Sequence, residues 1–132
     1  MLESSDVVAF VAATDLARAR AFYADALGLT LLNEDSYACT FSAHGTILRV
    51  SRVDEIFIAP YTVLGWSVSH IAATVRSLNE AGVVFERFAS MDQDELGVWD
   101  APGGARVAWF KDPDGNTLSV TQNADGDSDT HG

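Results

Sequence analysis

Side chains that commonly perform catalysis or bind metal ions are scarce in this sequence. The three histidines are His44 at a predicted turn, His70 at a predicted helix start and His131 in a polar tail, and each is interpreted as a surface residue. The single cysteine, Cys39, lies in a strand pattern, which predicts a small buried hydrophobic residue. A cysteine nucleophile would need a nearby base, for which His44 is the candidate. The sequence contains no nucleophile elbow, phosphate loop or dinucleotide-binding fingerprint.

Acidic side chains offer two further possibilities. Asp92, Asp94 and Glu95 fall in one predicted loop, where they form either a cation site or a solvated acidic surface. Asp100 follows a tryptophan in a strand pattern and is either a general base or a solvated strand residue. Neither pattern defines a reaction, so no catalytic residue is assigned from residue types alone.

Length, composition and charge limit the possible classes of protein. The chain has 132 residues, of which 48% are hydrophobic, so it is expected to fold as one globular domain with its own core. A net charge of −11 argues against nucleic acid as a partner, because binding to phosphates needs a basic surface. The acidity either serves solubility or attracts a cationic small molecule. Residues 122–132 are acidic and polar, which predicts a disordered tail.

Two features bear on location in the cell. The chain lacks an apolar run of the roughly 18 residues that a membrane-spanning helix needs, and we expect no membrane partner. The N-terminus lacks the basic and apolar pattern of a secretory signal, and one cysteine cannot form an intrachain disulfide. A cytoplasmic location is therefore predicted.

The elements that must position any site follow one pattern twice. A strand, a helix and three further strands are predicted in the first half, and the second half repeats this order with a fourth further strand from the last hairpin, so two βαβββ modules of an α+β fold are predicted. Asp15 and Ser69 are the predicted helix N-caps, and Gly28 and Gly82 end the two helices. The predicted strands are 7–13, 29–33, 37–43, 46–52, 61–68, 83–88, 97–101, 106–110 and 117–121, and the predicted helices are 16–27 and 71–81. One domain over residues 1–121 would contain module one, about 6–52, and module two, about 61–121.

The most specific motif is the last predicted hairpin. Residues 108–116 read AWFKDPDGN, in which Pro113 fixes φ for a turn and the following DGN supplies residues that tolerate positive φ. Two further motifs are DLARARAFY at residues 15–23, followed by LG at 27–28, and GWSV at residues 65–68. In this order and spacing, the motifs resemble the vicinal oxygen chelate superfamily, which includes glyoxalase I, extradiol dioxygenases, fosfomycin-modifying enzymes and bleomycin-resistance proteins. The resemblance covers nearly everything from Val7 to Thr121.

The resemblance implies two βαβββ modules whose curved mixed sheets surround a cup, often in a homodimer. Metal-using members carry one ligand on the first and one on the last strand of each module, typically His or Gln and Glu. The matching positions here are Val8, Arg49, Thr62 (within about one residue) and Ser119. A valine cannot coordinate, an arginine repels a cation, and two hydroxyls are poor donors. We therefore predict that the usual metal site is absent, and no cofactor is implied.

Strand alternation predicts what the cup would contain instead. Its lining is expected to be apolar and aromatic with one cation and several hydroxyls, which is typical of a small-molecule pocket. The predicted ligand-binding residues are Arg49, Phe10, Phe41, Thr62, Trp66, Ser119 and Thr121. Tryptophans 66, 99 and 109 are either core or interface residues or stacking surfaces for a ligand. Arg49 either pairs with an acid of its own chain or of a dimer partner, or it anchors a carboxylate, phosphate or phenolate ligand.

Three functions fit these observations. The favoured one is a metal-independent small-molecule-binding protein, similar in principle to the bleomycin-resistance branch, with its ligand near Arg49. The alternative is a metal-independent isomerase or lyase in which Arg49 acts as an electrophile. The third is a regulatory or partner-binding dimer with an empty cup. The net negative charge of the chain favours a cationic ligand, whereas Arg49 favours an anionic one. Inside a cup we expect Arg49 to determine the charge of the ligand, since surface charge is screened over about 8–10 Å.

Overall fold

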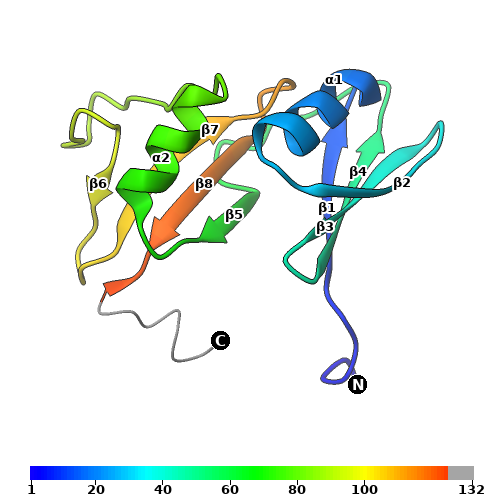
Figure 1. Ribbon diagram of the computed structural model, residues 1–132, viewed down its shortest axis with the longest axis horizontal. Coiled ribbons are helices and arrows are strands. Elements are labelled where there is room, and N and C mark those ends of the chain that lie inside the picture. Colours follow the sequence, from blue (N-terminus) through cyan, green and yellow to red (C-terminus); the bar gives the residue numbers. More distant parts are fainter. Residues whose placement is uncertain (125–132) are drawn as a thin grey trace. The chain divides into compact units, whose positions relative to one another are not determined.

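The computed structural model describes residues 1–124, and the chain divides into two compact units, Met1–Ile58 and Ala59–Gly132. Each unit contains one four-stranded mixed sheet, with strand orders β1-β4-β3-β2 and β5-β8-β7-β6 (Figure 1). In both units the first strand pairs in parallel with the last, and the other pairs are antiparallel. The predicted α+β class and the repeated βαβββ order are confirmed. Of the predicted tail, Gln122 belongs to β8, and residues 125–132 lie outside the described residues.

The first unit follows the predicted order with small shifts of the boundaries. Its elements are β1 (Val8–Ala13), α1 (Leu16–Arg20), the π-helical turn η1 (Ala21–Ala26), β2 (Thr30–Glu34), β3 (Ala38–Ala43) and β4 (Thr46–Arg52). The Asp15 carboxylate accepts a hydrogen bond from the Arg18 N–H at 3.2 Å and caps α1 as predicted. The expected continuous helix instead widens, and the Leu27 N–H bonds the Phe22 carbonyl five residues earlier. The widened turn carries the fully buried Tyr23 against the sheet.

The second unit departs from the prediction at one strand. Its elements are β5 (Leu64–Ser67), α2 (Ile71–Glu80), β6 (Trp99–Asp100), β7 (Arg106–Lys111) and β8 (Thr117–Gln122). The predicted strand 83–88 reduces to an isolated bridge between Phe85 and Phe110. Backbone groups of this segment bind the side chain of Gln93 and not a neighbouring strand. The Gln93 amide donates to the Glu86 carbonyl at 3.0 Å and accepts from the Phe88 N–H at 2.8 Å. Backbone groups satisfied by one side chain do not form a ladder.

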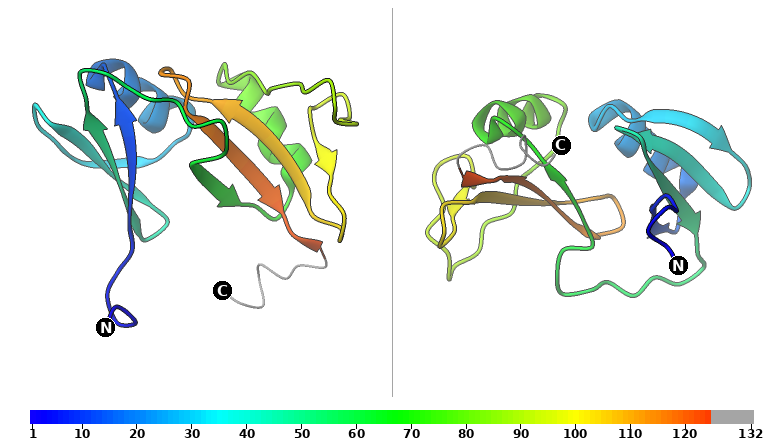
Figure 2. Two further views of the ribbon diagram at one scale, coloured as in Figure 1. Left: turned by 180° about the vertical axis from the view of Figure 1, so that it is seen from behind. Right: turned by 90° about the horizontal axis from the view of Figure 1, so that it is seen from below.

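Each helix covers one face of its sheet. In the first unit, the Cys39 thiol reaches the Leu16 carbonyl at 3.9 Å and Tyr23 packs on Phe41, which places these strand residues beneath the helix. In the second unit, α2 lies in front of its sheet in Figure 1 and buries Ile71 and Val75. Seen from behind, the other face of that sheet has no helix over it within the described residues (Figure 2). Each unit therefore has one core face and one open face. No helix of the described part is long and apolar enough to cross a membrane.

The N-terminus of α2 is capped from outside its own segment. The N-cap is His70 rather than the predicted Ser69, and the His70 side chain makes no capping bond. Instead, the Gln122 Oε1 atom accepts from the Ile71 N–H at 2.8 Å. This bond joins the start of the helix to the end of the last strand, 51 residues away in sequence.

We expect Gln122→Ala to lower the free energy of unfolding by about 1 kcal/mol, the usual effect of losing a helix cap. Gln122→Glu keeps an oxygen at this position and adds a negative charge near the helix N-terminus, so it should preserve stability. Urea denaturation of the three chains measures both effects. Equal loss in both variants would show that the cap is not the cause.

Candidate functional site

The open face of the first sheet contains the strand residues that could meet a ligand. Arg49 on β4 pairs with Phe10 on β1 and with Thr40 on β3, and Thr40 pairs with Asn33 on β2. Cross-strand partners project from the same face of a sheet. These four residues thus form one row across the sheet on the face away from the helix. We call this row, Phe10, Arg49, Thr40 and Asn33, the Arg49 row.

Arg49 has few partners within this row. Its Nη1 atom lies 3.5 Å from the Thr40 hydroxyl oxygen, which is a long hydrogen bond. Among the ion pairs of residues 1–124, none within 4.0 Å involves Arg49. The alternative of a salt bridge to an acid of the same chain is therefore not found in the described part. The half-buried guanidinium keeps donors that face no carboxylate.

Asp35 is the acid whose charge bears on Arg49. Its carboxylate accepts from the Tyr37 N–H at 2.8 Å and from the Ala38 N–H at 3.0 Å. These two bonds lower the pKa of Asp35, and attraction to the Arg49 charge lowers it a little further. Asp35 is thus an ionised turn residue that biases the field near Arg49 without pairing with it.

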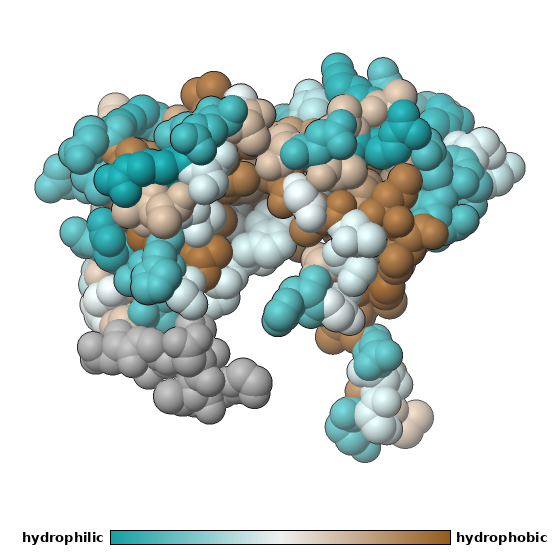
Figure 3. Space-filling model, in the orientation of Figure 1, coloured by the Kyte–Doolittle hydropathy of each residue, from teal (hydrophilic) through white to brown (hydrophobic). Residues whose placement is uncertain are grey.

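Phe10 is exposed beside this cation. Its side chain is 64% exposed and has no ring contact with another described residue. Val8, two residues earlier on the same face, is 43% exposed. Apolar side chains reach the surface over the strands of the first unit (Figure 3). Exposed apolar area next to a half-buried cation is typical of a recognition surface.

Phe41 was predicted to bind the ligand, but the structure places it in the core. It is fully buried, with its ring 5.9 Å from that of Tyr23 on the helix-covered face. Its partner Leu48 alternates with Arg49 along β4, so Phe41 and Arg49 project from opposite faces of the sheet. Phe41 is therefore a core residue.

The second sheet brings Ser119 and Thr121 to its own open face. Ser119 pairs with Gly65 on β5 and Trp109 on β7, and Thr121 pairs with Ser67 and Val107. Ser119 is 7% exposed. A Cβ atom on residue 65 would lie 2.7 Å from the Ser119 Oγ atom, so glycine leaves the space that this hydroxyl occupies.

Trp66 and Thr62 do not join this face. The half-buried Trp66 stacks on Phe110, with 6.4 Å between the ring centroids, on the face of the sheet that α2 covers. Thr62 precedes β5 and is exposed. The cap of α2 lies at His70, one residue later than predicted. Positions of the second module that are matched to the first by their distance from the helix cap therefore move by one residue. Val63 then corresponds to Val8.

The structure adds an aromatic group that the sequence analysis left undecided. The Trp109 ring lies 6.0 Å from the Trp99 ring and 5.6 Å from the Phe88 ring, on the same face as Ser119. The signal was present in the hairpin: counting outward from its turn pairs Ser119 with Trp109. The indole surface beside Ser119 is therefore that of Trp109, not of Trp66.

The other chemical candidates have structural roles. Burial raises the pKa of the Cys39 thiol, and nearby Glu34 raises it further, which favours the unreactive thiol. Asp100 pairs with Arg106 at 3.1 Å. Asp94 accepts from the Leu96 and Val98 N–H groups, both at 2.9 Å, and lies 3.5 Å from Arg106. Both carboxylates, of Asp94 and Asp100, are thus engaged in hydrogen bonds or ion pairs within the second unit.

The donor set does not fit a divalent metal. At the four positions matched to family ligands, the structure presents Val8, Arg49, Ser119 and, after the one-residue shift, Val63. Two alkyl groups, a cation and one hydroxyl supply no carboxylate or imidazole. Over residues 1–124, no cluster of three or more His, Cys, Asp or Glu side chains could hold a metal ion.

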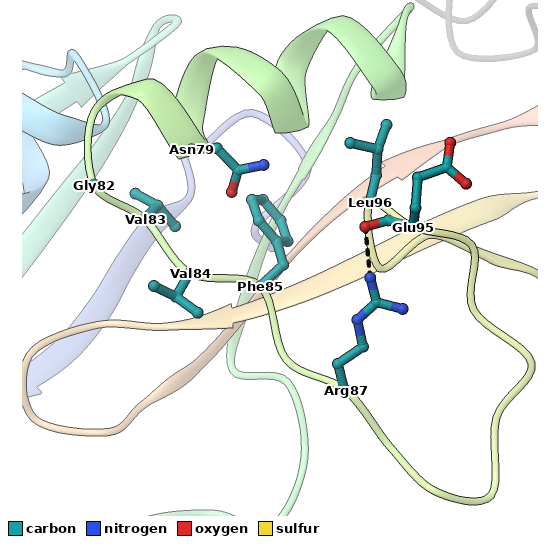
Figure 4. Close-up of a pocket in the computed structure, with 8 residues that line it drawn as sticks. All are labelled: Asn79, Gly82, Val83, Val84, Phe85, Arg87, Glu95 and Leu96. Carbon is teal, nitrogen blue, oxygen red and sulfur yellow. Dashed lines mark hydrogen bonds between the residues drawn. The ribbon is translucent and has the colours of Figure 1, made fainter.

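A separate shallow pocket of about 360 Å³ lies beside the C-terminal end of α2 (Figure 4). Arg87 closes one side by donating to the carbonyls of Asp94 and Glu95. Its lining residues are Asn79, Gly82, Val83, Val84, Phe85, Arg87, Glu95 and Leu96. None of the sequence-predicted site residues lines it.

Comparisons with known proteins agree with this architecture. A member of the glyoxalase/bleomycin resistance protein/dioxygenase superfamily from Sphaerobacter thermophilus matches with a TM-score of 0.72 and 22% identity, covering 93% of this chain and 100% of that one. A glyoxalase family protein from Bacillus anthracis matches with a TM-score of 0.71 and 17% identity, covering 91% and 95%. A lactoylglutathione lyase from Agrobacterium tumefaciens matches with a TM-score of 0.69 and 17% identity, covering 90% and 93%.

The sequence itself identifies the family. No curated protein matches the chain. The family model described as Glyoxalase/Bleomycin resistance protein/Dioxygenase superfamily matches residues 6–120, which include both βαβββ modules and the 108–116 hairpin. The predicted resemblance is therefore confirmed, and the chain belongs to the Glyoxalase/Bleomycin resistance protein/Dioxygenase superfamily.

Proposed function

We propose that this chain is a small-molecule-binding protein that works without the divalent metal site usual in its family, with the ligand held beside Arg49. The observation that carries the proposal is Arg49 itself: a half-buried guanidinium in a position matched to a metal ligand, with one long hydrogen bond to Thr40 and no ion pair in the described part. A cation there would repel a metal ion and attract an anionic ligand. We further propose a cytoplasmic homodimer.

Mass spectrometry under native conditions tests this proposal. The full chain would be screened against a library of small anions and cations, and bound compounds would be identified by mass. Metal content would be measured on the same preparation. Stoichiometric zinc, nickel, manganese or iron, located at Arg49 or at Ser119 by crystallography, would contradict the proposal.

Arg49→Gln is expected to weaken binding of an anionic ligand about 10- to 100-fold, the effect of losing a charge-assisted hydrogen-bond pair. Glutamine retains most of the length of the side chain but not its charge. The matched control is Arg52→Gln on the same strand, since Arg52 pairs with the exposed Asp54 at 3.1 Å and lies on the other face. Calorimetry on the three chains measures the change. Equal weakening in both variants would place the ligand elsewhere.

A further inference from the structure

We propose that the ligand of this site is an aromatic monocarboxylate, with its carboxylate on Arg49 and its ring on Phe10. The inference rests on the proposed function, because it assumes that the Arg49 row is the binding site. It goes further by naming two groups that the ligand must carry and the residue that each group contacts. All residues of this site belong to the first unit and lie within the described residues.

The carboxylate follows from the state of Arg49. A guanidinium offers five N–H donors in a planar fork that matches the two oxygens of a carboxylate. Here one nitrogen makes the long bond to Thr40, and no acid of the described chain accepts the rest. Because the group is half-buried, a bidentate partner gains more than it would in open water.

The ring follows from the position of Phe10. Phe10 and Arg49 are Cα partners on neighbouring parallel strands, which lie about 4.8 Å apart. We place the ring of the ligand over β1, the strand next to Arg49, where the Phe10 side chain projects from the same face of the sheet. With 64% of its surface exposed and no ring partner, Phe10 can stack with a planar ligand. Val8 continues the apolar surface along the strand.

A single negative charge fits the surrounding field. The two strand arginines of the first unit are Arg49 and Arg52, and Arg52 lies on the helix-covered face. The remaining members of the row are neutral, and ionised Asp35 lies close enough to act on Arg49 through its charge. One cation balanced against a nearby anion favours a carboxylate over a doubly charged phosphate.

Titrations followed by NMR of the backbone amides would test the inference with named compounds. Benzoate is compared with cyclohexanecarboxylate, which keeps the charge without the planar ring, with benzyl alcohol, which keeps the ring without the charge, and with phenyl phosphate. We expect benzoate to bind best and to shift the amides of β1 and β4. Phe10→Leu should weaken benzoate about 2- to 10-fold and leave cyclohexanecarboxylate unchanged. Arg49→Gln should weaken both carboxylates, and Arg52→Gln neither.

The outcomes separate the two proposals. If cyclohexanecarboxylate or phenyl phosphate binds as well as benzoate, or if Phe10→Leu changes nothing, the aromatic monocarboxylate is wrong while a site at Arg49 stands. If none of the four compounds shifts β1 or β4, this inference fails; the library screen then decides on the proposed function, which fails if no compound depends on Arg49. Since Phe10 is exposed, Phe10→Leu is expected to fold, and its amide spectrum verifies this.

Discussion

Replacement of Phe110 by alanine is expected to lower the free energy of unfolding by about 3–5 kcal/mol, the range for a large aromatic residue removed from a core. Phe110 is fully buried on β7. Its ring lies 5.3 Å from that of Phe85 and 6.4 Å from that of Trp66. The substitution therefore removes the contact of β7 with Phe85, in the 83–88 segment, and its contact with Trp66 on β5. Guanidinium denaturation followed by circular dichroism measures the loss.

The matched control for Phe110→Ala is Phe57→Ala. Phe57 is 86% exposed, so its truncation should change stability by less than about 0.5 kcal/mol. If the two variants lost similar stability, the second sheet would not be packed around Phe110 as described. Phe110→Leu separates the loss of volume from the loss of the ring and should fall between alanine and the unchanged chain.

Asp112→Ala is expected to lower the free energy of unfolding by about 3 kcal/mol, because it removes several charge-assisted hydrogen bonds from a buried turn. The Asp112 side chain accepts from the Asp114 N–H at 3.0 Å, the Asn116 N–H at 2.9 Å and the Asn116 side-chain amide at 2.8 Å. Asp112 and Asn116 are each 6% exposed. Truncation would leave these donors without their acceptor in a site shielded from water.

A double-mutant cycle separates the parts of this effect. Asn116→Ala removes the bond from the side-chain amide to Asp112 and keeps the backbone N–H. The double variant should lose less stability than the sum of the single variants, because the residues share a contact. Asp54→Ala is the surface control, since the Asp54 side chain is 91% exposed in its pair with Arg52. Full additivity would show that Asp112 and Asn116 do not stabilise the turn through each other.

Sequence patterns located the repeated modules because hydrophobic periods and turn residues are local signals. The 112–116 turn predicted its hairpin, and Thr46–Arg52 appears in the structure with the predicted bounds. The 83–88 segment has the composition of a strand, yet the Gln93 side chain binds two of its backbone groups, the Glu86 carbonyl and the Phe88 N–H. That competition depends on a residue brought close by the fold, which strand periodicity does not report.

The candidate site was predictable where strand register follows from a turn, and was misassigned where it depends on a helix cap. Arg49 lies on the open face, with Phe10 as its neighbour. The cap of α2 lies at His70, one residue later than predicted. Gly65 on β5, and not Trp66, therefore lies beside Ser119. A change of one residue moves every side chain of a strand to the other face.

Cys39 has a practical consequence for chemical labelling. It is the single cysteine of the sequence, and its thiol is fully buried beneath the helix with a raised pKa. Thiol-reactive dyes and spin labels attack the exposed thiolate. The unmodified chain should therefore resist maleimides while folded. A cysteine introduced at Phe10, on the open face, would react alone, allowing spectroscopic reporters to be attached without first removing the native thiol.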